Sequence, residues 1–267
     1  MNSPTNQPLS GKLDFGIDVP GIRQGMLAAG VAGLFIAVAV GLIRTYLEQI
    51  SSNFAMSLVA VSLLIAAYGF FMGSYMTWAS RVGKLRTRQR LLDLASQMLG
   101  WTGSEKVLDV GCGRGLMLIG AALRLKQGAA IGIDLWRTED QAGNSLDAAL
   151  NNVQLAGVAD RVCIDTGDAR NLPYPNESFD LVLSHWVIHN LPDANDRRQT
   201  LNEMLRVLRP GGVIALADIE FINDYGRHLS SCGVVNIRKL SGGFEAAVMG
   251  ILSGGSYRPQ ALLARKV

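Results

Sequence analysis

The chain has 267 residues, of which 49% are hydrophobic and only 18% are charged, and its formal net charge is +3. Soluble domains usually carry about 25% charged residues, and the shortage here is local, because Arg44 and Glu48 are the only charged residues between Gln24 and Ser80. This uneven distribution excludes a disordered chain, a collagen-like chain and a uniformly globular protein. It predicts a membrane segment followed by one soluble domain.

Two apolar stretches, Gln24–Ile43 and Phe54–Tyr75, predict two helices that span a membrane. About 20 apolar residues make one span, and both stretches reach that length without a charge. A secretory signal would have a shorter apolar run, a core helix would keep a polar face, and an interfacial helix would need a charged face. We therefore expect a transmembrane hairpin over residues 24–80. The pattern Gly69-x-x-x-Gly73 permits close helix packing, within one hairpin or between protomers, so an oligomer formed through the hairpin stays open.

A cluster of basic residues after the second stretch predicts the orientation; it consists of Arg81, Lys84, Arg86, Arg88 and Arg90. By the positive-inside rule, this cluster and the soluble domain lie in the cytoplasm. Two spans return the N-terminal tail, residues 1–23, to the same side. We expect residues 81–100 to form a juxtamembrane flank and a lead-in helix. The cluster alone accounts for the positive net charge, so its expected partner is the lipid bilayer and no nucleic acid.

The remaining chain, residues 101–267, alternates between strand-like and helix-like segments. In chain order, the expected strands are KVLDVG, AAIGID, RVCID, FDLVLS, VIALADI, VVNIRKL and QALLARKV, and the expected helices are LMLIGAALRL, SLDAALNNVQLAG and Arg197–Leu208, with a turn at RPGG. This alternation predicts an α/β fold with a mostly parallel sheet and helices on both faces. Ligands of such sheets bind beyond the carboxyl ends of the strands. The three cysteines are odd in number and widely spaced, so neither a disulfide framework nor a cysteine metal site is expected.

One motif carries most of the chemistry, the sequence VLDVGCGRG at Val107–Gly115. Glycines at a strand-to-helix turn let the backbone approach a ligand closely and present amide groups to it. A dinucleotide-binding Gly-x-Gly-x-x-Gly motif would have glycine at the position of Leu116. The motif, with its acid before the glycines, resembles the first motif of class I S-adenosylmethionine-dependent methyltransferases.

Further family motifs follow in order at Ile131–Leu135, at Gly167–Ala169 with LPYPNESFDLVLS after it, and at Leu208–Gly212. The resemblance covers about two thirds of the chain, from Arg88 onward, and is nearest to the small-molecule subgroup that includes quinone and sterol C-methyltransferases. It implies a Rossmann-like, doubly wound sheet of seven strands that binds S-adenosylmethionine and releases S-adenosylhomocysteine.

The resemblance implies a role for each matching residue. Gly111 and Gly113 would pack under the amino-acid end of the cofactor, and Asp109 would hold its ammonium group directly or through water. Asp134 would accept both ribose hydroxyls, since a carboxylate has two acceptor oxygens. Taken singly, these acids could equally be helix-capping or loop residues.

The adenine ring would be covered by Leu135 or Trp136. Its amino group would donate to Asp168, with the amide of Ala169 nearby. Ser184 and His185 would line the mouth at which the methyl group is transferred.

Two histidines, His185 and His189, follow the fourth expected strand and are the candidates for catalysis. Histidine titrates near neutral pH and suits the removal of a proton from an acceptor. We predict that one of them is a general base, with Trp186 and Asn190 shaping the pocket; local hydrogen bonding by both histidines is the alternative. Two metal ligands spaced His-x-x-x-His would need a third ligand, which the sequence does not offer, so no metal is expected.

The sequence thus predicts a membrane-anchored methyltransferase that acts on a small, lipophilic acceptor such as a quinone, an isoprenoid, a sterol or a xenobiotic phenol or thiol. The region Phe221–Pro259 is the candidate for the acceptor pocket. Two other functions stay open: a membrane-bound S-adenosylmethionine-binding protein without turnover, and a nicotinamide-dependent reductase.

Overall fold

A computed structural model describes residues 12–46, 51–139, 141–255 and 257–267, with only the backbone described at Phe244 and Glu245. The chain divides into two compact units. The larger unit holds Met1–Phe15, Leu85–Thr138 and Gly143–Val267, and the smaller one holds Gly16–Lys84 and Glu139–Ala142. Of the expected tail, residues 1–11 lie outside the described residues, as do residues 47–50 of the expected connection between the apolar stretches.

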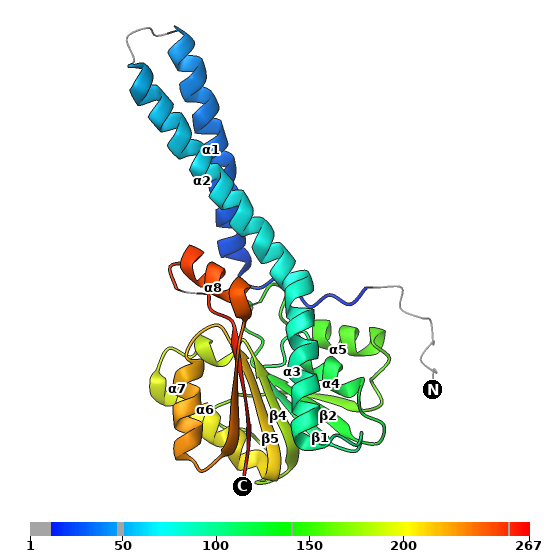
Figure 1. The fold of residues 1–267 in the computed structure, drawn as a ribbon. Coiled ribbons are helices and arrows are strands. Elements are labelled where there is room, and N and C mark those ends of the chain that lie inside the picture. Colours follow the sequence, from blue (N-terminus) through cyan, green and yellow to red (C-terminus); the bar gives the residue numbers. More distant parts are fainter. Residues whose placement is uncertain (1–11, 47–50, 140, 256) are drawn as a thin grey trace, which may run out of the picture. The chain divides into compact units, whose positions relative to one another are not determined.

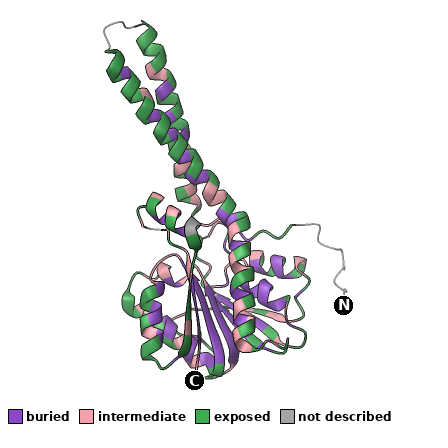
Figure 2. Cartoon of the chain, in the orientation of Figure 1, coloured by how far each residue is buried: buried purple, intermediate pink, exposed green. Residues whose placement is uncertain are grey.

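The smaller unit consists mainly of two antiparallel helices, α1 (Pro20–Tyr46) and α2 (Ser52–Trp78). Both are long and apolar enough to cross a membrane, and most of their residues are exposed, with buried positions only where the helices face each other (Figure 2). Helices of a soluble core would bury most of this apolar surface. The helices therefore have the length and the composition that the sequence predicts for two spans.

Small residues bring α1 and α2 into close contact. A Cβ atom added at Gly69 would lie 2.5 Å from the carbonyl oxygen of Met26, and one at Gly33 would lie 2.6 Å from that of Ser62. At Gly73, an added Cβ would lie 2.5 Å from the side chain of Leu27. Of the two uses that the glycine pattern left open, the structure shows packing within one hairpin.

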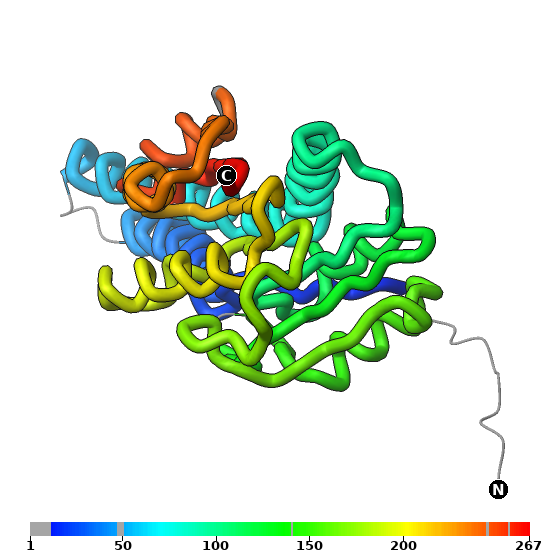
Figure 3. Tube along the Cα trace, turned by 90° about the horizontal axis from the view of Figure 1, so that it is seen from below, coloured from blue at the N-terminus to red at the C-terminus, as the bar shows by residue number. Residues whose placement is uncertain are grey.

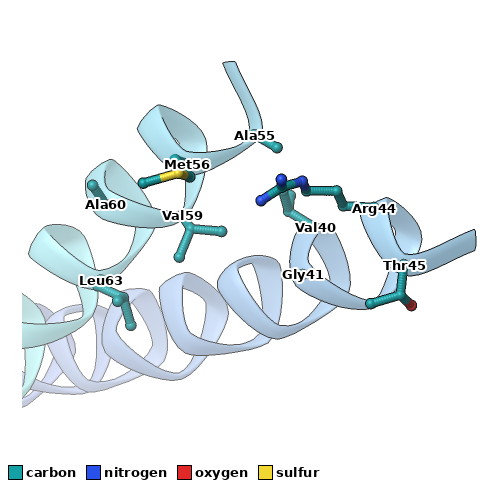
Figure 4. A pocket seen from close by; sticks show the side chains of 9 residues that line it. All are labelled: Val40, Gly41, Arg44, Thr45, Ala55, Met56, Val59, Ala60 and Leu63. Atoms are coloured by element: carbon teal, nitrogen blue, oxygen red, sulfur yellow. The ribbon is translucent and has the colours of Figure 1, made fainter. Parts of the chain in front are cut away.

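A cavity of about 600 Å³ separates the distal ends of the two helices (Figure 4). Its lining is mostly apolar and includes Val40, Met56, Val59 and Leu63. Arg44 extends from α1 toward α2, and its guanidinium group donates to Oγ of Ser52 over 2.8 Å. This hydrogen bond ties the two helices together beside their connection.

The near end of the hairpin is held by a buried ion pair. Lys84 is only 2% exposed, and its Nζ donates to the carbonyl oxygen of Gly16 (2.8 Å) and contacts Asp18 (3.2 Å). Asp18 also forms an isolated β-bridge with Gln141. Of the basic cluster that the sequence places beside the membrane, Lys84 thus has a structural role instead of a solvated one.

The larger unit contains a sheet of seven strands in the order β3-β2-β1-β4-β5-β7-β6. The strands are β1 (Lys106–Val110), β2 (Ala129–Asp134), β3 (Val162–Thr166), β4 (Phe179–His185), β5 (Leu208–Asp218), β6 (Val235–Ser241) and β7 (Gln260–Arg265). β7 runs antiparallel to both of its neighbours, β5 and β6, and the pairings among β1 to β5 are parallel. The predicted mostly parallel, seven-stranded sheet is therefore confirmed, with a strand at every expected segment.

Helices cover both faces of this sheet (Figures 1 and 3). On one face, α3 (Lys84–Leu99), α4 (Leu116–Ala122) and α5 (Leu146–Leu155) pack on inward residues such as Val107 and Leu183. On the other face, α6 (Ala194–Val207) and α7 (Ile222–Ser231) pack on residues such as Leu108 and Ile214. Buried parallel strands carry apolar side chains on both faces, which is why β1 and β4 read as continuous apolar runs.

Three elements differ from the sequence-based expectation. The region Phe221–Pro259, which has little pattern, contains the helices α7 and α8 (Gly243–Leu252). The expected RPGG turn lies inside β5, where the pairing with β4 shifts in register. The lead-in helix α3 begins at Lys84 and follows α2 through the π-helical turn η1 (Ala79–Gly83), so the basic cluster is itself helical.

A short N-terminal segment also belongs to the larger unit and runs beside α5 (Figure 3). The amide of Asn152 donates to the carbonyl oxygen of Asp14 (2.8 Å) and to that of Arg114 (2.9 Å). Asp14 also forms an ion pair with Arg114 (3.0 Å), and Phe15 is buried in the core under α3. These residues are thus part of the folded domain, although the sequence places them in a polar tail.

Candidate functional site

The glycine-rich turn joins β1 to α4 at the carboxyl end of the sheet. Gly111 has a φ of 73°, and the N–H groups of Gly111 and Cys112 both donate to the carbonyl oxygen of Ile133 at the end of β2. A Cβ atom at Gly111 would lie 2.4 Å from the side chain of Val187, which follows β4. The turn therefore lies against the ends of two neighbouring strands and has room only for glycine at this position.

Asp134 ends β2 and organises the turn beside it. Its Oδ2 accepts from the N–H of Gly113 (2.8 Å), and its Oδ1 accepts from the N–H of Trp136 (2.7 Å) and from the amide of Asn144 (3.2 Å). A carboxylate offers about four acceptor positions, so three are used by the protein. Asn144 is 6% exposed, and no sequence pattern singled it out.

The residues after Asp134 form an aromatic edge. Trp136 has a φ of 61°, and its indole N–H donates to Oγ1 of Thr166 at the end of β3 (2.8 Å). Leu135 is 44% exposed. Both residues that were predicted to cover an adenine ring therefore lie at the carboxyl ends of β2 and β3, and Trp136 is the one held in place by a hydrogen bond.

Asp109 lies beneath the glycine-rich turn and is only 1% exposed. Its Oδ2 accepts from the N–H of Leu118 in α4 (2.8 Å), while Oδ1 has no hydrogen-bond partner among the described residues. Burial raises the pKa of Asp109 to about 7, the charge of Asp134 adds to this effect, and the hydrogen bond from Leu118 opposes it. One carboxylate oxygen thus anchors α4, and the other is buried without a hydrogen-bond partner among the described residues.

Asp168 follows β3 and is held by Arg170. Nε of Arg170 contacts both carboxylate oxygens (3.1 and 3.0 Å), and its Nη1 bonds Asp196 of α6 (2.7 Å). The hydrogen bonds from Arg170 hold the pKa of Asp168 below its usual value. The following residue, Ala169, packs against the core under α6. Sequence reasoning missed Arg170, since nothing in its spacing reveals that it joins two acids that are 28 residues apart.

The end of β4 brings the predicted catalytic residues together. Ser184 is 2% exposed, and the ring of His185 stacks on that of Trp186 with 4.9 Å between their centroids. Trp186 in turn meets the ring of Tyr257 edge-on at 5.9 Å. The side chain of Asn190 lies in the short helix η2 (Ile188–Asn190) that follows.

His189 is paired with an acid that the sequence analysis did not select. Its Nδ1 lies 2.5 Å from Oδ1 of Asp218, and its main-chain N–H donates to Oδ2 of the same residue (3.1 Å). Asp218 ends β5 and is 2% exposed. The signal was present in the segment VIALADI, because an acid at the carboxyl end of a buried parallel strand faces the ligand edge of the sheet.

One thiol, that of Cys112, also lies at this edge. Burial, reinforced by the charges of Asp109 and Asp134, raises the pKa of Cys112, so its thiol stays protonated and unreactive. Among the described residues, no group of three His, Cys, Asp or Glu side chains is placed to hold a metal ion. The side chains at the edge can bind hydroxyl and ammonium groups and, at His189, can hold a proton.

The sequence and the structure were compared with those of known proteins. Residues 108–216 match a family described as a methyltransferase domain. Methyltransferase GfsG of Streptomyces halstedii is 39% identical over 131 residues, which are 49% of this chain and 44% of that protein. The 27-O-demethylrifamycin SV methyltransferase of Amycolatopsis mediterranei is 37% identical over 129 residues, 48% of this chain and 44% of that protein. The chain thus spans less than half the length of these two relatives.

Solved structures share the fold of the larger unit. A putative sarcosine dimethylglycine methyltransferase from Galdieria sulphuraria has a TM-score of 0.53 at 19% identity, covering 72% of this chain and 88% of that one. The geranyl diphosphate C-methyltransferase of Streptomyces coelicolor has a TM-score of 0.52 at 16% identity, covering 68% and 80%. The larger unit therefore shares the fold of these two proteins, and the Rossmann-like sheet that the sequence predicted is confirmed.

Proposed function

We propose that this chain transfers the methyl group of S-adenosylmethionine to a small acceptor. The match of residues 108–216 to a methyltransferase domain supports the reaction class, and the observation that carries the proposal for this chain is the arrangement around Asp134. This carboxylate joins the glycine-rich turn, through Gly113, to the aromatic edge, through Trp136. A nucleoside with a charged amino-acid tail would need a carboxylate, a glycine-rich turn and an aromatic edge, and Asp134 joins the other two.

The hydrogen-bonding groups at this edge fit this cofactor. Asp109 has one buried carboxylate oxygen without a partner among the described residues, which suits the ammonium group of the amino-acid end. Asp134 has one acceptor position left for a ribose hydroxyl, and a second hydroxyl would replace the longest of its three hydrogen bonds, the one from Asn144. Asp168 and the amide of Ala169 would receive the adenine edge, and Ser184 and His185 would line the methyl-transfer mouth. When bound, the sulfonium group supplies an electrophilic methyl carbon, and in-line approach of the acceptor is set by positioning.

Membrane anchoring is the second part of the proposal. The helices α1 and α2 have the length and composition of spans, and the basic cluster after them favours a cytoplasmic location for the larger unit. Anchoring concentrates the enzyme near a membrane-dissolved acceptor, so we propose that the acceptor is lipophilic. Protease protection in sealed vesicles tests the topology: the larger unit should be cleaved only from the cytoplasmic side.

Calorimetry with S-adenosylmethionine and S-adenosylhomocysteine on the full chain in detergent tests the cofactor site. We expect binding of both, weakened by about 1–3 kcal/mol in Asp134→Ala, because hydrogen bonds to a charged group are lost. The matched control is Asp147→Ala, which removes an exposed acid in the first turn of α5. Absence of binding to the folded protein, or equal affinity of Asp134→Ala and wild type, would contradict the proposal. Binding without methylation of any cell extract would indicate a binding protein instead of an enzyme.

A further inference from the structure

The distal end of the hairpin, where α1 ends and α2 begins, combines an apolar cavity with a positive charge. The cavity of about 600 Å³ lies between the two helices and is lined by apolar side chains such as Met56, Val59 and Leu63 (Figure 4). This volume falls within the range of about 300–1,000 Å³ that is usual for ligand sites. Met56 and Leu63 are 60% and 46% exposed, so the cavity is open at the side of the hairpin. A hydrocarbon chain can therefore enter it from the side.

The charge belongs to Arg44, which lies in the last turn of α1 and lines the cavity. Its Nη2 donates to Oγ of Ser52 over 2.8 Å, and no carboxylate of the described residues forms an ion pair with it. Glu48, the other charged residue of the apolar region, lies outside the described residues. A guanidinium has five N–H donors. The bond to Ser52 uses one of them and leaves the positive charge available to an anion.

The start of α2 adds to the attraction for an anion. The backbone N–H groups of a first helical turn lack partners within the helix, and they form the positive end of the helix dipole. Ser51 at the N-cap makes no side-chain cap, and the first turn, Ser52–Ala55, contains no acid. Ala55 of this turn lines the same cavity as Arg44. A guanidinium and the positive end of a helix thus lie beside one apolar cavity, which suits a phosphate group joined to a hydrocarbon chain.

The opposite end of the hairpin shows that the bond from Arg44 does not by itself require a cavity. Arg23 of α1 donates through Nε to Oγ1 of Thr77 in α2 over 2.8 Å, so it ties the two helices together as Arg44 does. At that end the helices pack closely, because a Cβ atom added at Gly73 would lie 2.5 Å from the side chain of Leu27. The separation of the helices beside Arg44 therefore has another cause.

We propose that this cavity binds one membrane phospholipid, whose phosphate group is held by Arg44 and the start of α2 and one of whose acyl chains lies between the helices. The proposal rests on the membrane anchoring proposed above and goes beyond the methyl-transfer reaction. In a hairpin of two spans, the connected end lies at the headgroup level of one leaflet, where an arginine meets lipid phosphates. The guanidinium forms paired, charge-assisted hydrogen bonds with phosphate oxygens. The acyl chain occupies a space that the helices do not fill themselves, and it supplies van der Waals contacts to the side chains around it.

Native mass spectrometry of the full chain in detergent tests the proposal, with dioleoylphosphatidylglycerol and dioleoylglycerol as the probes. The two lipids have the same acyl chains, and only the first has a phosphate group. We expect one phosphatidylglycerol per chain, no retained dioleoylglycerol, and no displacement by an excess of inorganic phosphate. Equal retention of the two lipids, displacement by inorganic phosphate, or a dimer that excludes the lipid would overturn the proposal.

Two substitutions test the two parts of the site. Arg44→Gln should lower the retention of phosphatidylglycerol about tenfold or more, because hydrogen bonds between charged groups are lost. Ala60→Phe should abolish retention by filling the cavity that Ala60 lines. The matched controls, Arg23→Gln and Ala67→Phe at an exposed position of α2 outside the cavity lining, should retain the lipid as wild type does. Wild-type retention in Arg44→Gln, or an equal loss in Arg23→Gln, overturns the proposal.

Folding of the variants is checked by the protease resistance of the hairpin in detergent and by the affinity of the larger unit for S-adenosylhomocysteine. Both should be unchanged in all four variants. If Arg44 only ties the helices together, Arg44→Gln makes the hairpin protease-sensitive and Ala60→Phe keeps its lipid, which overturns the proposal. Protease protection in sealed vesicles separates this inference from the proposed anchoring. A hairpin that spans the membrane and retains no phospholipid overturns the inference alone, whereas a hairpin that does not span overturns the anchoring as well.

Discussion

Replacement of Asp109 by asparagine should change the stability of the protein relative to wild type in a pH-dependent way. The difference should shift in favour of the variant as the pH rises. The pKa of this buried carboxyl is about 7 in the folded protein, against a reference value of 3.8. Between these values the native state holds a proton that the unfolded state has released, so the stabilisation is complete below about pH 4 and is lost as the pH rises through 7. From pH 5 to pH 8, wild type should lose roughly 2–3 kcal/mol through this one group. The asparagine variant lacks that loss.

Thermal unfolding of the full chain in detergent, followed by tryptophan fluorescence, measures the effect. The difference in Tm between Asp109→Asn and wild type should change by roughly 5–10 °C in favour of the variant between pH 5 and pH 8, at about 2–4 °C per kcal/mol for a domain of this size. Asp147→Asn, at an exposed position in α5, is the control. If the Tm values of wild type and Asp109→Asn changed in parallel with pH, desolvation of Asp109 would not be the cause and the reasoning would be refuted.

The same carboxyl links cofactor affinity to pH. If the ionised form of Asp109 holds the ammonium group, the fraction available rises from about 9% at pH 6 to about 76% at pH 7.5 for a pKa near 7. We expect affinity for S-adenosylhomocysteine to rise roughly eightfold over this range in wild type. The variant should bind more weakly and with little dependence on pH.

Three further substitutions probe contacts described above. Gly111→Ala should destabilise the larger unit by about 2–4 kcal/mol in thermal or urea unfolding, since it combines a left-handed backbone with a clash against Val187; near-wild-type stability would argue against the close approach. Arg170→Met should weaken S-adenosylmethionine binding several-fold in calorimetry, because Asp168 loses the group that orients it; unchanged affinity would remove Asp168 from the site. Gly69→Leu should separate α1 from α2 and make the hairpin protease-sensitive in detergent, whereas Gly41→Leu, with open space around it, should not.

The fold was largely predictable because its determinants are local in sequence. The central strands β1 and β4 are buried on both faces and appear as apolar runs. Helices between strands have their own period or cap, such as Ser145, which accepts from the N–H of Ala148. The helices α7 and α8 were not predicted because glycines and polar residues interrupt their apolar residues. Tertiary packing therefore decides whether they form. The turn at RPGG was predicted, but the extension of β5 through it was not, because the register shift there depends on the partner strand.

The site was predictable to the extent that single motifs supply it. Asp109 and the glycines stand in one motif and Asp134 ends the next, and the structure places them at one edge of the sheet. Interactions between distant residues carried no such signal. The ion pair of Arg170 with Asp196 joins the segment after β3 to α6. The contact of His189 with Asp218 across 29 residues forms because β4 and β5 end side by side. Which histidine meets Asp218 could not be predicted from two histidines four residues apart.

Residues 12–15 belong to the larger unit but precede the hairpin in the chain. Asp14 and Phe15 pack with Arg114, Asn152 and the core, yet the whole hairpin lies between them and the rest of that core in the chain. During synthesis this segment leaves the ribosome before the hairpin, and its partners emerge only after both apolar helices have been made. The domain therefore cannot finish folding until the hairpin has been synthesised. A variant that begins at Leu85 lacks a piece of the core of the larger unit. A soluble version would have to keep residues 12–15 joined to Leu85 by a linker.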